Sequence, residues 1–282
     1  MSSLQSHDPC DIINDMTRQP VVAGRFYSAG EAALRHDIES LLPTETEKQI
    51  DAKGVICPHA GYMYSGSVAA ETLSAIKPKP VYIILGPNHT GAGEAIGVDL
   101  GRSWKTPLGN AEIDRALAEA IIEESEHVLK DAVSHDGEHS IEVVLPFLQY
   151  FGDFKFVPIC VSSSMGNAYK EIGSAISNAV KKTKKDVTVI ASSDMTHYET
   201  QGSAKKKDEL AINEILNLDA LGLLKTVTKN EISMCGVLPA AIMIEASRGL
   251  GARKAKLVKY ATSGDTSGDC SAVVGYAGIV VY

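Results

Sequence analysis

Short runs of apolar residues alternate with longer helix-forming segments along most of the chain. Two of these runs, residues 81–85 (VYIIL) and 187–191 (VTVIA), are apolar almost throughout. Strands of this composition are typical of a parallel sheet that helices cover on both faces. Strands that alternate with helices of about ten or more residues indicate βαβ units. The pattern therefore predicts an α/β fold with a central, mostly parallel, mixed β-sheet flanked by helices.

The predicted elements cover the chain without a break between domains. Strands are expected at residues 54–57, 81–85, 95–99, 155–161, 187–191, 256–260 and 272–281, and helices at 30–42, 68–76, 111–124, 140–150, 169–181, 204–216, 220–225 and 238–247. The closing segment contains Gly275 and Gly278 and is compatible with two strands or with one bulged strand. Because no Pro-, Gly- or Ser-rich linker divides the chain, we expect a single domain at residues 20–282 after a polar lead-in at residues 1–19.

Charge and cysteine content exclude several classes of protein. The net charge of -8, from 27 basic and 35 acidic residues, argues against a nucleic-acid partner, whose binding surface would be basic. No apolar run approaches the roughly 20 residues of a membrane helix, and the first residues do not resemble a signal peptide. The five cysteines are scattered and form no disulfide framework. We therefore expect a soluble protein of the reducing cytoplasm, with no membrane partner.

Histidines follow three of the predicted strands. His59 lies in PHAGY, His89 in PNHTG and His197 in SSDMTHY. In an open α/β sheet, ligands bind beyond the carboxyl ends of the strands, and parallel strands bring those ends to one edge. A single histidine after a strand is more often a hydrogen-bonded loop residue than a ligand. Three of them at three strand ends favour a functional site.

Two further positions near these histidines have alternative interpretations. Asp194 and His197 form either a helix cap with a surface histidine or a general base oriented by an acid. Cys235 precedes a predicted helix, where a cysteine has a lowered pKa and is more readily the thiolate that a soft metal or a nucleophilic reaction needs. It is otherwise a small buried hydrophobe. Cys57 is the second candidate for the functional thiol after Cys235, and Cys270 is a further possible contributor to the site.

The segment HDGEHS at residues 135–140 combines acids and imidazoles at the start of a predicted helix. Acids there are favourable electrostatically. The functional alternative makes Glu138 and His139 a pocket wall or a proton relay. Tyr62, after His59, and Asn88, before His89, are further candidates for the wall of a substrate pocket. Motifs for dinucleotides, P-loop nucleotides, zincin metals and the serine-hydrolase elbow are absent from the sequence.

The motifs VAGRFY, CPHAGYMYSG, LGPNHTG, EHSIEVVLPFLQY, SSDMTHY, CG and SAVVGYAG occur in this order. Together they resemble the MEMO1 (Memo-like) family, also called AmmeMemoRadiSam system protein B in bacteria and archaea. The resemblance runs from about residue 20 to residue 282. One local difference is Phe26-Tyr27-Ser28, where the family often has Phe-Tyr-Pro.

The resemblance implies a fold similar to the class III extradiol dioxygenases, the LigB-like group. Those enzymes bind non-haem Fe(II) through two histidines and a carboxylate, and the Memo-like family has a cysteine in place of the carboxylate. By motif, the implied metal ligands are His59, His89 and Cys235. Asp194 and His197 would stand beside the metal, with His197 at the acid/base position. One transition-metal ion per chain is implied, Fe(II) first, with Cu or Zn as alternatives.

The resemblance leaves two functions open. The first is a metal-dependent oxidoreductase that acts on a small substrate. The second is a non-enzymatic protein that binds a peptide or a small anion in the same pocket. The family has been connected with copper-dependent redox activity, iron handling and phosphotyrosine-peptide binding. Its bacterial and archaeal members often accompany a radical-SAM protein and an AMMECR1-like protein, which are the implied functional partners.

Overall fold

The computed structural model describes residues 17–45, 48–101, 103–165 and 168–282. Most of the predicted lead-in, residues 1–16, lies outside the described residues. Its described end is packed against the fold, since Arg18 is only 3% exposed. No helix within these ranges is long and apolar enough to cross a membrane.

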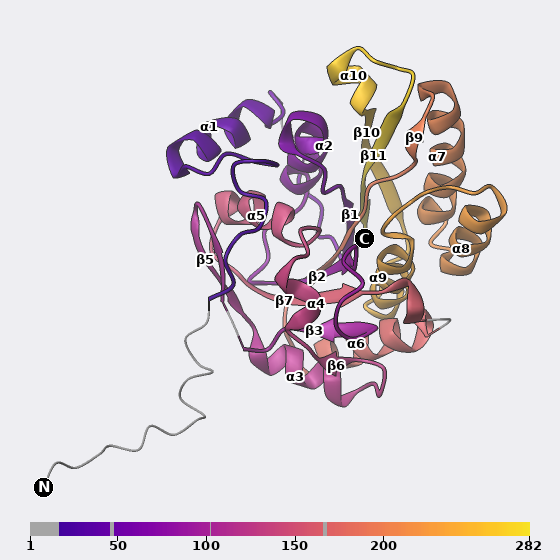
Figure 1. Ribbon diagram of the computed structural model, residues 1–282. Coiled ribbons are helices and arrows are strands. Elements are labelled where there is room, and N and C mark those ends of the chain that lie inside the picture. Colours follow the sequence, from indigo (N-terminus) through magenta and orange to yellow (C-terminus); the bar gives the residue numbers. More distant parts are fainter. Residues whose placement is uncertain (1–16, 46–47, 102, 166–167) are drawn as a thin grey trace, which may run out of the picture.

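One mixed sheet organises the fold (Figure 1). Across it lie, in order, β10 (Ala255–Thr262), β11 (Val273–Val281), β1 (Gly54–Cys57), β8 (Val187–Ser192), β2 (Val81–Pro87), β7 (Lys155–Val161), β3 (Ile96–Val98) and β6 (Leu129–Lys130). The central strands β1, β8, β2 and β7 are parallel, whereas β11 and β3 join them antiparallel. The predicted α/β class with a mostly parallel, mixed sheet is therefore confirmed.

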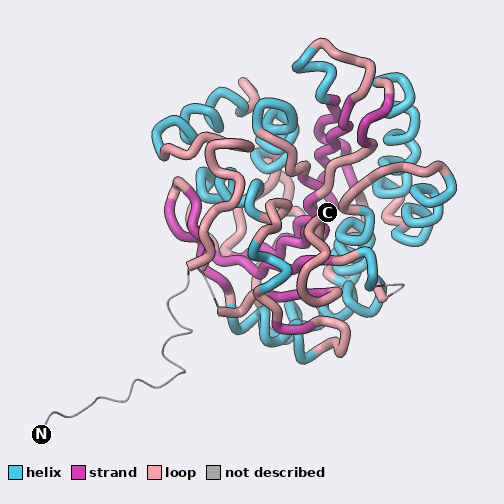
Figure 2. The backbone as a smooth tube through the Cα atoms, in the orientation of Figure 1, coloured by secondary structure: helices cyan, strands magenta, loops and turns pink. Residues whose placement is uncertain are grey.

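Helices cover both faces of the sheet (Figure 2). The core on one face contains side chains of α1 (Glu31–Leu41), α2 (Tyr62–Ser74) and α5 (Leu145–Phe151). The core on the other face contains side chains of α3 (Arg115–Glu123), α6 (Tyr169–Thr183), α7 (Gln201–Leu216), α8 (Ala220–Lys229) and α9 (Val237–Gly249). Side chains alternate between these cores, so that Val55 and Cys57 of β1 enter the first and Ile56 enters the second. Burial of each large apolar side chain stabilises the fold by about 1.5–3 kcal/mol, which is why strands covered on both faces are apolar throughout.

Several elements differ from the predicted ones. Helix α2 begins six residues earlier than expected, because Tyr62 is buried and its ring stacks on Phe147 with centroids 4.4 Å apart. This packing outweighs the low helix propensity of Tyr and Gly. Residues 111–113 belong to strand β5 (Gly109–Ile113) instead of a helix, because Asp114 caps α3 by accepting the Leu117 backbone N–H at 3.1 Å. β5 pairs with β7 and with β4 (Trp104–Thr106).

Two more elements lie near the ends of the sheet. The closing segment is one strand, β11, and a register shift lies between Leu257 and Lys259 of its neighbour β10. A short strand, β9 (His197–Glu199), pairs with β11 and was not predicted.

The three strands that precede the predicted site end at one edge of the sheet. β8 lies between β1 and β2, and it pairs Ser192 with Cys57 and Ala191 with Leu85. The loops that follow these strands therefore leave the sheet side by side.

Candidate metal centre

Three imidazoles meet beyond this edge of the sheet. His59 and His89 each lie two residues past the end of their strand, and their ring centroids are 5.3 Å apart. His139 joins them from the segment after α4 (Val133–Asp136), at 5.6 Å from His59 and 4.9 Å from His89. One ring nitrogen of each residue lies within 4.8 Å of the others. We call these three residues the histidine cluster.

The hydrogen bonds of Ser192 determine which nitrogen of His59 carries its proton. The Ser192 hydroxyl donates to the Ser140 carbonyl at 2.6 Å and contacts His59 Nδ1 at 2.8 Å. A hydroxyl has one hydrogen, so it must accept the second bond from a protonated Nδ1. The lone pair of His59 is then on Nε2, which lies 3.4 Å from Cys235 Sγ.

The carboxylate of Glu138 contacts the imidazoles of both His89 and His139. Its carboxylate is 1% exposed, and it accepts from His89 Nδ1 at 2.9 Å and from the His89 backbone N–H at 2.6 Å. The same carboxylate lies 3.4 Å from His139 Nδ1. A carboxylate bonded to one nitrogen of a histidine leaves the other nitrogen free and more basic, as in many metal centres. The carboxylate of Glu138 therefore lies beside the imidazoles of His89 and His139, where it can orient both rings.

The protonation states of His59 and His139 suit a cation. Burial lowers the pKa of His59 well below its usual value, and the neighbouring His89 and His139 add to the effect. Burial also lowers the pKa of His139, against the charge of Glu138. Burial opposes a charge on His89, but the hydrogen bond and charge of Glu138 prevail and raise its pKa. For Glu138, burial is outweighed by the His89 hydrogen bond and charge and by backbone donors, so its pKa is about 2. His59 and His139 are thus neutral at pH 7, the form that binds metals.

Cys235 stands directly beside His59. Its sulfur accepts the Asp194 backbone N–H at 3.3 Å, and the next residue, Gly236, is the N-cap of α9. A Cβ on Gly236 would lie 2.4 Å from the Ser192 carbonyl oxygen, so only glycine allows this approach. The predicted lowered pKa of Cys235 is wrong for the protein alone, because burial and the Asp194 carboxylate raise it. A bound cation would displace the thiol proton.

The other two candidate thiols lie in different surroundings. Cys57 is buried in the core on the α2 side of the sheet, and burial raises its pKa. Cys270 is exposed between α10 (Ser263–Ser267) and β11.

The hydrogen bonds of Asp194 and His197 differ from the expected ones. Asp194 Oδ1 accepts the His59 backbone N–H at 2.9 Å, and burial raises the pKa of this carboxyl. The ring of His197 instead places Nδ1 2.9 Å from the Ser233 carbonyl oxygen. The described hydrogen bonds therefore make Ser233, instead of Asp194, the residue that orients His197. A carbonyl accepts only from a protonated Nδ1, so His197 Nε2 is free to accept a proton.

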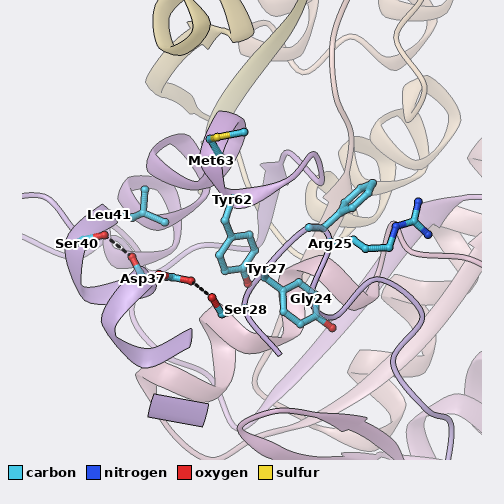
Figure 3. A pocket seen from close by; sticks show the side chains of 10 residues that line it. Gly24, Arg25, Tyr27, Ser28, Asp37, Ser40, Leu41, Tyr62 and Met63 are labelled. Atoms are coloured by element: carbon cyan, nitrogen blue, oxygen red, sulfur yellow. Dashed lines mark hydrogen bonds between the residues drawn. The ribbon is translucent and has the colours of Figure 1, made fainter. Parts of the chain in front are cut away.

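The side chains of the predicted pocket residues Tyr62 and Asn88 form hydrogen bonds with backbone groups. The Tyr62 hydroxyl donates to the Val143 carbonyl at 2.9 Å, and the residue lines a separate cavity of about 360 Å³, where Ser28 and Ser40 bond to Asp37 (Figure 3). Asn88 Oδ1 accepts from the backbone of Thr90 and Gly91 and so closes the turn after His89.

The sequence indicated His139 as part of a pocket wall or a proton relay and not as a metal ligand. The available signal was its neighbour Glu138, because an acid beside a histidine is a common way to orient a ligating imidazole.

The fold and the cluster define an α/β protein with a candidate metal centre at the carboxyl edge of its parallel strands. The Memo-like protein family model matches residues 18–280, and the chain belongs to this family. A MEMO1 family protein of Methanopyrus kandleri is 44% identical over 280 residues, which is 94% of this chain and 99% of that protein. One from Pyrobaculum aerophilum is 43% identical over 278 residues, with shares of 94% and 99%.

A solved structure has a similar fold. An uncharacterized protein from Escherichia coli K12 matches with a TM-score of 0.51 and 13% identity, covering 80% of this chain and 98% of that one. At this identity the likeness concerns the fold alone.

A second buried histidine, His135, predicts acid sensitivity. His135 lies in α4, with Nε2 3.0 Å from the Gly97 carbonyl, and burial lowers its pKa to about 4. The unfolded chain takes up this proton near pH 6.5 and the folded chain only near pH 4, so stability falls as pH drops through this range. At about 1.4 kcal/mol per pH unit, the loss is about 3 kcal/mol. Urea unfolding at pH 7 and pH 4.5 measures it.

Replacement of His135 with Asn should flatten this pH dependence. His127→Gln removes an exposed imidazole and serves as the matched control. An unchanged profile in His135→Asn would show that other groups cause the acid sensitivity.

Proposed function

We propose that this protein binds one transition-metal ion at the histidine cluster and Cys235, and that the bound ion serves redox or oxygenase-type chemistry on a small substrate. The observation that supports the proposal is the convergence of three imidazoles, each with one ring nitrogen within 4.8 Å of the others, and the position of Cys235 Sγ at 3.4 Å from His59 Nε2. Neutral imidazoles and a thiol that can lose its proton fit such an ion. His89 is 36% exposed, so a ligand can reach the cluster from solvent.

Two ligand sets share His59 and His89. The third ligand is His139 in the set that the structure brings together and Cys235 in the set that the family resemblance implies. Imidazole and thiolate suit Fe(II), Cu and Zn, and the family resemblance favours Fe(II). A redox metal with an open coordination position supplies electron transfer or oxygen activation when it is bound.

The surrounding residues then have defined tasks. Ser192 and Glu138 hold the rings of His59 and His89 in the tautomers that direct a lone pair outward. Asp194 holds the backbone of His59. His197, oriented by Ser233, presents Nε2 as the acceptor or donor of a substrate proton. From the family resemblance we also propose a cytoplasmic protein that works with radical-SAM and AMMECR1-like partners.

Titration with Co²⁺ under anaerobic conditions tests the proposal and the third ligand. We expect one Co²⁺ per chain and an absorption band from sulfur-to-metal charge transfer. Cys235→Ser should remove that band, because an alcohol is a poor ligand for these ions. His139→Gln should instead keep the band and change the ligand-field spectrum if the imidazole also binds.

The outcomes separate the alternatives. A charge-transfer band that persists in Cys235→Ser would exclude this thiolate. A well-folded wild-type chain that binds no Co²⁺, Fe(II) or Cu would contradict the proposal and favour a binding protein for a peptide or small anion. Turnover of a catechol in air by the Fe(II)-loaded protein would then distinguish an oxygenase from a metal-binding protein.

A further inference from the structure

A buried arginine connects the first described residues to the segment that supports the histidine cluster. Arg18 Nε donates to the His135 carbonyl at 2.8 Å, and Nη2 donates to the Glu138 carbonyl at 2.5 Å. Nη1 donates to Glu142 Oε2 at 2.7 Å. The guanidinium also lies over the Trp104 ring, 4.1 Å from its centroid. One planar group therefore bonds three points of a single eight-residue segment.

The partner carboxylate extends the same network. Glu142 is fully buried and accepts from the backbone N–H groups of Val21 and Val22 and from the Tyr27 hydroxyl at 2.7 Å. The segment from Arg18 to Tyr27 is thereby bonded to residues 135–142. We call residues 18–27 the N-terminal strap.

The bonded segment contains the groups that hold two of the candidate ligands. Arg18 bonds the main chain of Glu138, and the side chain of Glu138 bonds the imidazole of His89 and lies against that of His139. A displacement of the Glu138 carbonyl would move the carboxylate and both rings with it. Metal sites tolerate such displacements poorly, because outer residues orient the ligands.

We propose that Arg18 is a positioning residue for the metal centre, acting through the Glu138 main chain, and that the N-terminal strap is part of the metal-binding machinery. This inference rests on the proposed function. Arg18 is not a ligand, since its guanidinium carries only donors. It is also not replaceable by lysine, whose ammonium is a point charge without the planar fork that reaches the two carbonyls and the carboxylate together.

The test compares Co²⁺ binding by the wild-type chain, Arg18→Met, Arg18→Lys and Lys79→Met. Lys79 is a matched control, because it is 7% exposed, pairs with Asp51 and Asp186, and precedes β2 at the sheet edge opposite the cluster. For each protein, the visible spectrum and the dissociation constant of Co²⁺ are measured, and urea unfolding with a chelator gives the stability of the metal-free chain.

We expect Arg18→Met to weaken Co²⁺ binding about tenfold or more and to alter the ligand-field spectrum. Arg18→Lys should show the same spectral change with a smaller loss of affinity. Lys79→Met should lose stability but keep the wild-type spectrum and affinity. If Arg18→Met does not fold, Arg18→Lys alone decides.

Two results would overturn the inference. The first is wild-type Co²⁺ affinity and spectrum in the folded Arg18 variants. The second is an equal loss of affinity in Lys79→Met, which would assign the effect to stability in general. Failure of the wild-type chain to bind Co²⁺ is a different result, because it contradicts the proposed function itself.

Discussion

His59→Ala is expected to abolish stable metal binding while the chain stays folded. His59 belongs to both ligand sets, and its Nε2 lies 3.4 Å from Cys235 Sγ. Loss of an outer residue that only orients a ligand costs about 10–100-fold in affinity, so loss of this ligand should exceed about 100-fold. Anaerobic Co²⁺ titration, followed by metal analysis after gel filtration, measures the change.

The His59→Ala variant should still fold, because the cluster lies at the end of the sheet and not in its core. The ring of His59 is an uncharged, buried group, and its backbone N–H can still bond Asp194. His127→Ala, at an exposed position, is the control that should keep full metal content. Wild-type metal content in His59→Ala would show that the ion binds elsewhere.

Glu142→Ala is expected to lower the free energy of unfolding by about 3–5 kcal/mol. The substitution leaves the buried guanidinium of Arg18 without its counter-charge, which is the costly way to break a buried ion pair. It also removes the acceptor of the Val21 and Val22 backbone N–H groups and of the Tyr27 hydroxyl. Urea or thermal unfolding of the metal-free chain measures the loss.

An exposed ion pair provides the matched comparison. Glu31 and Arg35 pair on the surface of α1 with side chains 61% and 45% exposed. Glu31→Ala should therefore cost no more than about 0.5 kcal/mol. A similarly small effect of Glu142→Ala would mean that water replaces the lost carboxylate and that the N-terminal strap is not held by this pair.

The sequence predicted the parts of the fold that depend on local pattern. Buried parallel strands must be apolar on both sides, so composition alone identifies β2 and β8. The predictions for the start of α2 and for residues 111–113 were wrong because tertiary contacts outweighed local conformational preference. Tyr62 extended α2 because its ring had a partner in Phe147, and residues 111–113 became a strand because β7 offered hydrogen bonds.

The same division applies to the site. The position of His59 and His89 after parallel strands, and of Cys235 before a helix, could be read from the chain because strand direction alone brings such ends together. The support of His89 by Glu138, the carbonyl that orients His197 and the raised pKa of Cys235 could not. These depend on distances between residues far apart in sequence and on how completely water is removed around each group.

The sequence by itself thus determined the class of fold, the family and the two histidines common to both ligand sets. Only the tertiary structure decided that His139 completes the cluster. It also decided that Arg18 donates a hydrogen bond to the carbonyl of Glu138, which lies 120 residues away in the chain. The reason is physical. Patterns in sequence report the burial and direction of local elements, whereas hydrogen-bond partners and pKa values are set by the neighbours that folding brings within a few ångströms.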